Sequence, residues 1–296
     1  MRMVRTIAEL RAALPPRHRD GRSVGLVPTM GAFHEGHLSL MRAARERCDL
    51  VVVSLFVNPA QFGDGQDLAA YPRDEERDAA LAAAEGVDLL FAPAFQEIYP
   101  QGFGTTVRVA GVTERLEGRH RPGHFEAVAT VVVKLFNLVQ PDVAFFGRKD
   151  AQQAAMIRRL ARDLDIPVEI DVRPTVREPD GLAMSSRNAH LSEAEREHAL
   201  ALSRALRAVE QAAADGLTPA EALAAGRAEL AAAGVEPEYL EAVSATTLQP
   251  AEDFFAQDVL VAVAARIGRT RLIDNVVVPA GDRGRDLGRQ ALECNA

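Results

Sequence analysis

The stretch VGLVPTMGAFHEGH, residues 24–37, decides the fold of this chain. It begins with an apolar run at 24–27 and leads into a helical pattern at 37–47, which predicts a strand that turns directly into a helix. Such a turn gathers backbone N–H groups and the positive end of a helix dipole, and both favour an anion. We therefore expect a phosphate-bearing ligand at this turn.

Two histidines flank a glycine in this stretch, in the pattern H-x-G-H at 34–37. Imidazoles can be charged or neutral near pH 7, and Gly36 has no Cβ that would keep a nucleotide from the helix backbone. The pattern is typical of enzymes that attack the α-phosphate of ATP and expel pyrophosphate, because positioned donors stabilise the charge that grows on the leaving group. The alternative is a capping histidine beside a half-buried one, but the strand before and the helix after favour nucleotide chemistry.

Short apolar runs alternate with helical patterns over the first two-thirds of the chain. We expect strands at 24–27, 50–57, 88–92, 143–146 and 168–172, and helices at 37–47, 74–84, 125–139 and 150–164. Runs of this kind are typical of strands buried on both faces of a parallel sheet. The sequence therefore predicts an α/β fold with a doubly wound, Rossmann-like parallel sheet over residues 1–176, which binds ligands at the carboxyl ends of its strands. Residues 1–5 lead directly into a helix-like pattern.

The pattern changes after residue 176. Residues 178–181 signal a turn, Ser192 with Glu195 forms a capping box for a helix to about 214, and Pro219 opens a second helix. Strand-like runs follow at 239–243, 259–264, 270–273 and 276–278. We expect a smaller C-terminal α+β domain at 177–280 and a disordered tail at 281–296.

Composition narrows the class of protein. The chain has 296 residues, of which 48% are hydrophobic and 26% charged, with a net charge of −8. This mix is typical of globular proteins, and nothing in it indicates a nucleic-acid or anionic-membrane partner. No apolar run is long enough to span a membrane, no signal peptide is recognisable, and Cys48 and Cys294 are too far apart for a disulfide framework or a zinc site. We expect a cytoplasmic protein.

Further polar clusters stand at strand ends and in loops. At 145–150, Gly147 opens a turn, Lys149 offers a charge to phosphate and Asp150 caps the next helix; Lys149 is one of only two lysines in the chain. At 184–187, two hydroxyls and a guanidinium suit phosphate oxygens in a loop that closes over them. Gln61 suits a substrate with hydroxyls and a carboxylate. Each cluster alone could be a plain turn, and for 119–125 the turn is the favoured interpretation.

Taken in order, these segments resemble the pantoate–β-alanine ligase (pantothenate synthetase) family, an adenylate-forming branch of the H-x-G-H nucleotidylyltransferase-like superfamily. The resemblance spans about residues 1–280 and rests on segments 28–31, 34–37, 57–62, 70–73, 121–125, 134–137, 140–142, 146–150, 152–153 and 184–188. Several motifs in the family's order and spacing are far more specific than any one of them. Arg148 departs from the family's pattern, in which Glu is usual at this position, and so do Ala151 and Ala127.

The resemblance implies a reaction in two steps. ATP and pantoate give pantoyl adenylate and pyrophosphate, and the amine of β-alanine then attacks the adenylate to give pantothenate and AMP. It also implies Mg²⁺ with ATP, held mostly by phosphate oxygens and water with no identified protein ligand, and a homodimer built through the N-terminal domain.

The resemblance assigns roles to individual residues. His37 would be the active-site histidine, His34 its partner at the triphosphate, and Lys149 a contact of the phosphates. Gln61 and Gln153 would hold pantoate, with Gln61 also near β-alanine. The ATP site would comprise Met30, Gly31, Ala32, Phe33, His34, Glu35, Gly36, His37, Gly147, Arg148, Lys149, Asp150, Val176, Met184, Ser185, Ser186 and Arg187.

Two other functions compete with the ligase. A nucleotidylyltransferase that acts on a phosphorylated acceptor would share the motif and the fold, but Gln61 and Gln153 argue against it because a phosphate acceptor favours Arg or Lys. A non-catalytic nucleotide-binding module would be indicated by loss of His37 or Lys149, and both residues are present.

Overall fold

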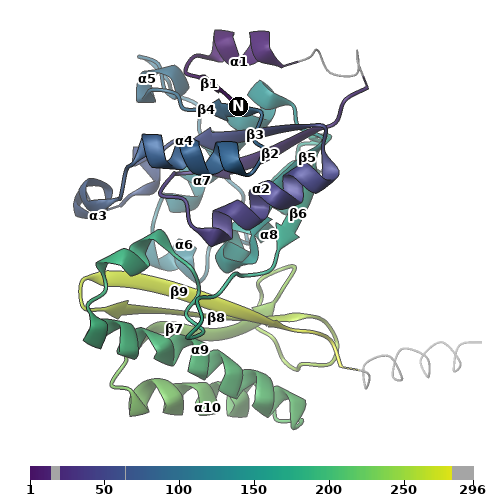
Figure 1. The fold of residues 1–296 in the computed structure, drawn as a ribbon. Helices are drawn as coiled ribbons and strands as arrows, with labels where there is room; N and C mark the ends of the chain where they lie inside the picture. Colours follow the sequence, from purple (N-terminus) through teal and green to yellow (C-terminus); the bar gives the residue numbers. More distant parts are fainter. Residues whose placement is uncertain (15–20, 64, 282–296) are drawn as a thin grey trace, which may run out of the picture.

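The computed structural model describes residues 1–14, 21–63 and 65–281 of the chain. Within these residues the strands form one six-stranded and one three-stranded sheet, which lie in the upper and lower halves of the molecule in Figure 1. No helix in the described ranges is both long enough and apolar enough to cross a membrane. The predicted tail at 281–296 lies outside the described residues except for Gly281.

The first sheet is parallel, with its strands in the order β1-β4-β3-β2-β5-β6. Its strands are β1 (Arg2–Val4), β2 (Val24–Thr29), β3 (Leu50–Leu55), β4 (Leu89–Phe91), β5 (Val143–Gly147) and β6 (Glu169–Arg173). The chain builds outward from β2 through β3 and β4, then returns to the other side of β2 to add β5 and β6. This reversal is the topological switch point of a doubly wound fold, so the predicted fold class is confirmed.

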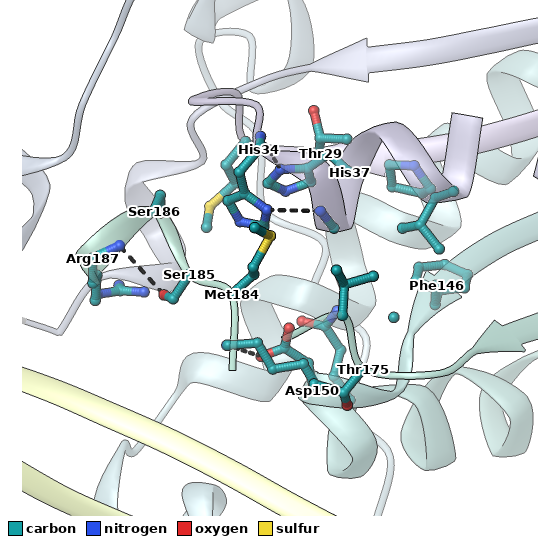
Figure 2. A pocket seen from close by; sticks show the side chains of 18 of the residues that line it. Thr29, His34, His37, Phe146, Asp150, Thr175, Met184, Ser185, Ser186 and Arg187 are labelled. Atoms are coloured by element: carbon teal, nitrogen blue, oxygen red, sulfur yellow. Dashed lines mark hydrogen bonds and ion pairs between the residues drawn. The ribbon is translucent and has the colours of Figure 1, made fainter. Parts of the chain in front are cut away.

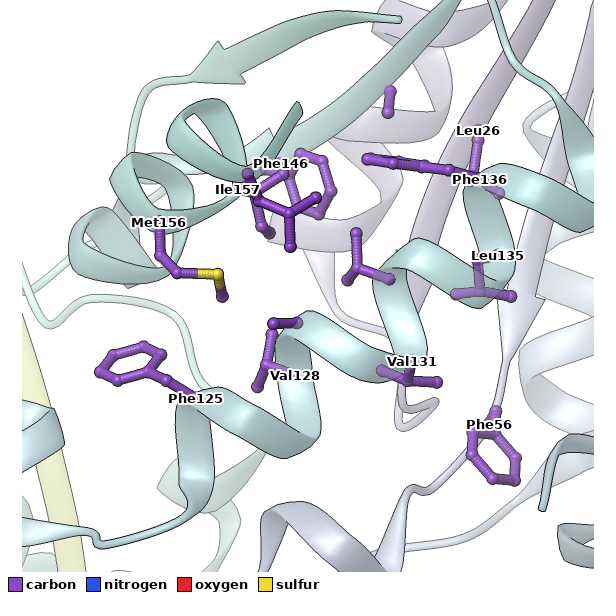
Figure 3. Close-up of a cluster of buried hydrophobic side chains, with 14 of the residues drawn as sticks. Leu26, Phe56, Phe125, Val128, Val131, Leu135, Phe136, Phe146, Met156 and Ile157 are labelled. Carbon is purple, nitrogen blue, oxygen red and sulfur yellow. The ribbon is translucent and has the colours of Figure 1, made fainter. Parts of the chain in front are cut away.

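Helices cover both faces of the first sheet. On one face, α2 (Glu35–Arg47) and α4 (Glu75–Ala84) pack on Val27, Val53 and Phe145. On the other face, α1 (Ile7–Ala13), α7 (His124–Val139) and α8 (Ala151–Asp163) pack on alternate residues of the same strands, including Leu26 and Phe146 (Figure 3). The shorter helical segments are η1 (Pro59–Gln61), α3 (Gly65–Ala70), α5 (Phe95–Ile98), α6 (Glu117–His120) and η2 (Arg148–Asp150).

The second unit follows η3 (Ser186–His190). It comprises α9 (Glu193–Ala214), α10 (Pro219–Ala232) and an antiparallel sheet of β7 (Pro237–Ser244), β8 (Val259–Ile267) and β9 (Thr270–Val278). The predicted capping box at Ser192–Glu195 forms, and α10 begins with Pro219 as expected, with a further capping box between Thr218 and Glu221. Figure 1 shows this three-stranded sheet between α9 and α10 on one side and, on the other, the six-stranded sheet with its helices, which we call the first unit.

Strand β8 is buried on both faces and joins the two units. Val259, Val261 and Val263 face the core with α9 and α10, whereas Leu260 and Ala262 belong to the core cluster of α7 and α8. Apolar contact therefore continues across residue 176, and the division into domains at that residue stays a prediction.

The structure differs from the expected elements at the chain's first and last strands. Residues 2–4 form strand β1 rather than leading straight into a helix, because Arg2–Val4 pair with Leu89–Phe91 at the sheet edge. A three-residue strand is too short for its periodicity to be visible. The runs at 270–273 and 276–278 are one strand, since Asp274 and Asn275 between them are buried and continue the pairing with β8.

Candidate active site

A cavity lies at the carboxyl edge of the first sheet, at the switch point. Because β2 pairs with β3 on one side and β5 on the other, the loops that follow β2 and β5 diverge and leave a crevice between them. Residues after β6 and the segment 184–187 close its open side (Figure 2). The cavity is lined by Pro28, Thr29, Met30, His34, Gly36, His37, Leu40, Gln61, Phe62, Tyr71, Arg121, His124, Phe146, Gly147, Lys149, Asp150, Gln153, Pro174, Thr175, Val176, Met184, Ser185, Ser186 and Arg187.

The turn from β2 into α2 is held by a buried carboxylate. Gly31 and Ala32 are both left-handed, with φ of 84° and 53°. Asp78, on α4, accepts hydrogen bonds from the backbone N–H groups of Ala32 at 2.7 Å and Phe33 at 2.8 Å. A Cβ on Gly31 would lie 3.0 Å from the Asp78 carboxylate, so a glycine is needed there for both conformation and space. The turn that presents the histidines is thus fixed from a neighbouring helix.

The two histidines cap the helix that carries them. His34 is the N-cap of α2, and its Nδ1 accepts from the Gly36 N–H at 3.2 Å. The His37 ring reaches back, and its Nδ1 accepts from the His34 N–H at 3.4 Å. The ring centroids lie 4.1 Å apart. The backbone N–H groups expected to face an anion are therefore partly used by the imidazoles.

Both imidazoles are neutral and carry their proton on Nε2. Burial, with a smaller effect of Lys149, lowers the pKa of His34 to about 4. Burial, followed by the neighbouring His34 and Lys149, lowers the pKa of His37 to about 3. Because each Nδ1 accepts a backbone hydrogen bond, the single ring proton lies on Nε2. Each ring thus offers one N–H donor in place of the helix N–H that it caps.

Gly36 is required by this arrangement. A Cβ at Gly36 would lie 2.9 Å from His34 Cε1 and 3.0 Å from His34 Nδ1. The glycine thus allows the His34 ring to reach its capping position, which adds to the close nucleotide approach expected from the sequence.

Lys149 and Asp150 form the opposite wall. They lie in η2, directly after β5, and Lys149 Nζ is 3.6 Å from Asp150 Oδ1. Asp150 occupies the N-cap position of α8, but its side chain makes no capping hydrogen bond, so the predicted cap is wrong. The half-exposed Asp150 carboxylate instead lines the cavity (Figure 2).

The segment 184–187 closes over the cavity and contacts the first unit. Ser186 Oγ donates to Tyr71 Oη at 3.4 Å, and the Arg187 guanidinium lies 5.9 Å from the Tyr71 ring centroid. Ser185 Oγ accepts from the Arg187 N–H at 3.3 Å, which shapes the turn (Figure 2). Hydroxyls and a guanidinium therefore line the same cavity as the histidines.

Gln61 is held at both its side chain and its backbone. The fully buried Asn58 donates from Nδ2 to Gln61 Oε1 at 2.9 Å, which leaves the Gln61 Nε2 group as a donor at the cavity wall. The Gln61 carbonyl accepts from Arg121 Nη2 at 3.1 Å and His124 Nδ1 at 2.9 Å. Burial, followed by Arg121, lowers the pKa of His124 to about 4, so its unprotonated Nε2 accepts from Arg121 Nη1 at 3.3 Å.

The structure brings most of the expected site residues to this cavity but not all of them. Gln61, Gln153, His34, His37, Lys149 and the segment 184–187 line it together. Outside its lining are Gly31, Ala32, Phe33, Glu35 and Arg148. Phe33 is a core side chain, Glu35 pairs with Arg42, and the exposed Arg148 lines a separate cavity against α8. These residues shape the turns, and their expected contacts with ATP stay predictions.

Some cavity residues received no role from the sequence. Arg121 and His124 lie in the segment 119–125, for which the sequence favours a plain turn, yet both side chains donate to or contact the Gln61 carbonyl. The segment Arg121–Phe125 is one of those that resemble the family, but its residue types alone predict no role in binding or catalysis. Asp78 acts through backbone groups from another helix, and no sequence pattern marks such a contact.

The residues at the cavity are compatible with a metal ion that binds together with the phosphates of a nucleotide. In the described part of the chain, no group of three His, Cys, Asp or Glu side chains is placed to hold a metal ion. Mg²⁺ usually needs only one or two carboxylates together with phosphate oxygens and water. Asp150 supplies a carboxylate at the cavity wall.

Comparison with known protein families gives one match over nearly the whole chain. The family model for pantoate-beta-alanine ligase matches residues 2–277. The pantothenate synthetase of Koribacter versatilis is 53% identical over 287 residues, which cover 96% of this chain and 98% of that protein. The pantothenate synthetase of Heliobacterium modesticaldum is 53% identical and covers 94% of this chain and 99% of its own length.

Solved structures give the same result. The pantothenate synthetase from Thermus thermophilus superposes with a TM-score of 0.90 at 53% identity, covering 94% of this chain and 100% of that one. The pantoate-beta-alanine ligase from Francisella tularensis, complexed with beta-gamma ATP and beta-alanine, superposes with a TM-score of 0.80 at 32% identity, covering 95% and 99%.

Proposed function

The chain belongs to the pantoate–β-alanine ligase family, and from this premise we propose how its cavity joins pantoate to β-alanine with ATP. In the first step a pantoate carboxylate oxygen attacks the α-phosphorus, and the bond to the β-phosphate oxygen breaks to release pyrophosphate. In the second step the β-alanine amine attacks the acyl carbon, loses a proton and expels AMP. Both steps need positioning and charge stabilisation more than covalent help from the protein.

One observation carries the assignment of roles: neutral imidazole donors, Lys149 and two glutamines line the same cavity. Negative charge grows on the leaving pyrophosphate, and donors that are already placed stabilise it without reorganisation. His34 and His37 would supply Nε2–H donors on one wall and Lys149 a cation on the other. Ser185, Ser186 and Arg187 would hold the phosphates from the closing segment.

Gln61 and Gln153 would hold pantoate. The Gln61 amide is turned so that its Nε2 donates, which suits a hydroxyl or carboxylate oxygen. Uncharged amides also suit the second step, because an Arg or Lys in their place would put a positive charge beside the amine of β-alanine. This favours the ligase over a transferase that would bind a phosphorylated acceptor.

Mg²⁺ would enter with ATP. It would neutralise phosphate charge, held by phosphate oxygens and water, with Asp150 as the side chain able to add a ligand. We further propose the homodimer through the N-terminal unit and the cytoplasmic location that the resemblance implies. Light scattering of the purified chain tests the dimer.

The decisive experiment measures AMP release from ATP, Mg²⁺ and D-pantoate, with and without β-alanine. We expect AMP and pantothenate to form in equal amounts, and only when pantoate and β-alanine are both present. Pyrophosphate release with no amine-dependent product would instead indicate an adenylyl transfer to another acceptor.

A further inference from the structure

Strand β9 of the second sheet contacts two separate segments that adjoin the active-site cavity. Arg271 and Asn275 are four residues apart, so they lie on the same face of the strand. Arg271 contacts α6, and Asn275 contacts η2. We propose that β9 positions the two halves of the site independently, Arg271 the pantoate end and Asn275 the phosphate end. This inference rests on the proposed function and names positioning residues for it.

Arg271 holds a buried carboxylate of the first unit. Its Nη1 and Nη2 each lie 2.7 Å from an oxygen of Glu117, and the Tyr239 hydroxyl donates to Glu117 Oε1 at 2.7 Å. Glu117 is only 6% exposed. Burial would raise the pKa of Glu117, but the hydrogen bonds and charge of Arg271 outweigh it and lower the pKa to about 2. The carboxylate is therefore charged and fixed by donors from β7 and β9.

Glu117 in turn faces Arg121, which reaches the pantoate end. Arg121 Nη1 is 3.6 Å from Glu117 Oε2, and Arg121 Nη2 donates to the Gln61 carbonyl. The backbone N–H of Glu117 also donates to Gln152 Oε1 at 3.0 Å. Arg271 is thus connected through Glu117 and Arg121 to the residue that would bind pantoate.

The backbone around Glu117 has little room to shift. Leu116 has a positive φ of 47°, which is strained for a residue with a side chain. A Cβ on Gly118 would lie 1.8 Å from the Thr113 carbonyl oxygen, so the chain is folded tightly on itself there. A change in the Glu117 carboxylate is therefore passed to Arg121 rather than absorbed by the loop.

Asn275 holds the backbone of the phosphate wall. Its Nδ2 donates to the carbonyl of Arg148 at 3.0 Å and to that of Lys149 at 2.7 Å. Asn275 is 5% exposed, and its Oδ1 is buried with no hydrogen-bond partner among the described residues. Burying that oxygen costs free energy, so the contribution of this side chain is its two donated bonds. It fixes the turn from which Lys149 extends.

The test compares two single variants by steady-state kinetics with each substrate in turn. Arg271→Gln removes the fork on Glu117, and Asn275→Leu removes both donors at nearly the same volume. Arg47→Gln is the matched control, because Arg47 bridges Glu169 and Asp171 far along α2 from the cavity. Arg271→Lys tests rescue by a cation that lacks the planar fork.

We expect each variant to change the KM for one substrate and leave the KM for the other unchanged. Arg271→Gln should raise KM for pantoate about tenfold, the effect of losing one hydrogen bond to a charged group, with KM for ATP within twofold of wild type. Asn275→Leu should raise KM for ATP and slow pyrophosphate release, with KM for pantoate unchanged. Arg271→Lys should recover part of the loss, and Arg47→Gln should leave all constants unchanged.

Other results overturn the proposal. If either variant raises both KM values together, β9 acts on the whole site and the separate roles are wrong. If the melting temperature falls with no change in KM, the contacts only stabilise the fold. Should Arg271→Gln not fold, Tyr239→Phe, which deletes one hydroxyl, must still raise KM for pantoate alone. A wild-type enzyme that makes no pantothenate would instead refute the proposed function.

Discussion

At His34 and His37, one hydrogen bond on each ring decides where the proton lies. Each Nδ1 accepts from the backbone, so each Nε2 is a donor while the ring is neutral. Burial disfavours the charged form of each ring and, with a smaller effect of neighbouring groups, is the physical reason for the low pKa values. Near pH 7 the two rings are therefore neutral, and we expect them to act as hydrogen-bond donors rather than as cations.

Replacing His37 should slow adenylate formation strongly. We expect His37→Ala to reduce the single-turnover rate of pyrophosphate release by about 10²–10³-fold, which is typical of losing one placed donor. His198→Ala, on the exposed surface of α9, is the control and should retain the wild-type rate. A loss below threefold in His37→Ala would exclude the proposed role.

The buried histidines should stay neutral in mild acid. The pKa values of His34, His37 and His124 lie at about 4, 3 and 4, below the value of about 6.5 of an unfolded histidine. Between these values the unfolded chain binds more protons, so the free energy of unfolding should fall as pH drops from 7 to 5. Urea denaturation at both pH values measures this, and replacing the three with Gln should flatten the dependence. NMR signals of these rings that titrate near pH 6.5 would contradict it.

At the residue scale, the sequence predicted which side chains line the cavity better than it predicted which residues hold them in place. His34, His37, Lys149, Gln61 and Gln153 line one cavity as expected, because their motifs follow strands that end at the same sheet edge. Asp78 could not be predicted, since its role depends on α4 packing beside α2. The position of His124 likewise depends on where η1 lies.

At the scale of elements, the turn between β2 and α2 depends on a helix that comes later in the chain. Asp78 on α4 fixes the backbone of Ala32 and Phe33, and through them the start of α2. The strands and long helices were predictable because each buries a continuous apolar face. The edge strand β1 was not, because three residues carry no period and its pairing with β4 is non-local.

Asp78→Asn should impair the site more than the fold. An amide can accept one of the two backbone bonds but presents N–H to the other, so the turn should shift. We expect kcat/KM for ATP to fall by about 10–100-fold, as for a lost charge-assisted hydrogen bond. Asp74→Ala, which removes the cap of the same helix, should lower the melting temperature without changing kcat/KM. Equal kinetics in the two variants would refute the role of Asp78.

At the scale of the whole molecule, the second unit anchors the segment that closes the cavity. Asp274 on β9, 3% exposed, pairs with Arg177 through two contacts of 2.7 and 3.1 Å and so holds the strand-like bridge between Arg177 and Ala183. The segment 184–187 follows directly. The sequence predicted a smaller second unit and a closing loop, but the side chains that join them become neighbours only in the folded chain.

Breaking the Arg177–Asp274 pair should loosen that segment. Asp274→Asn removes the carboxylate charge that both contacts of Arg177 use, while the guanidinium, 33% exposed, keeps its hydrogen bond to the Gly181 carbonyl. We therefore expect Asp274→Asn to speed tryptic cleavage after Arg177 and Arg187 at least tenfold, with ATP slowing it again. Mass spectrometry of the first fragments measures this. Cleavage at the wild-type rate would show that the pair does not restrain the segment.

The position of β9 as the last described strand has a consequence for synthesis on the ribosome. Glu117, the Lys149 turn and Arg177 emerge 154, 126 and 97 residues before Arg271, Asn275 and Asp274, respectively, which bind them. A nascent chain can pair the first sheet early, yet these three segments lack their partners until residues 271–275 have been synthesised. Catalytic competence should therefore appear only after β9 has been synthesised, so a chain stalled before residue 271 would be folded in part but inactive.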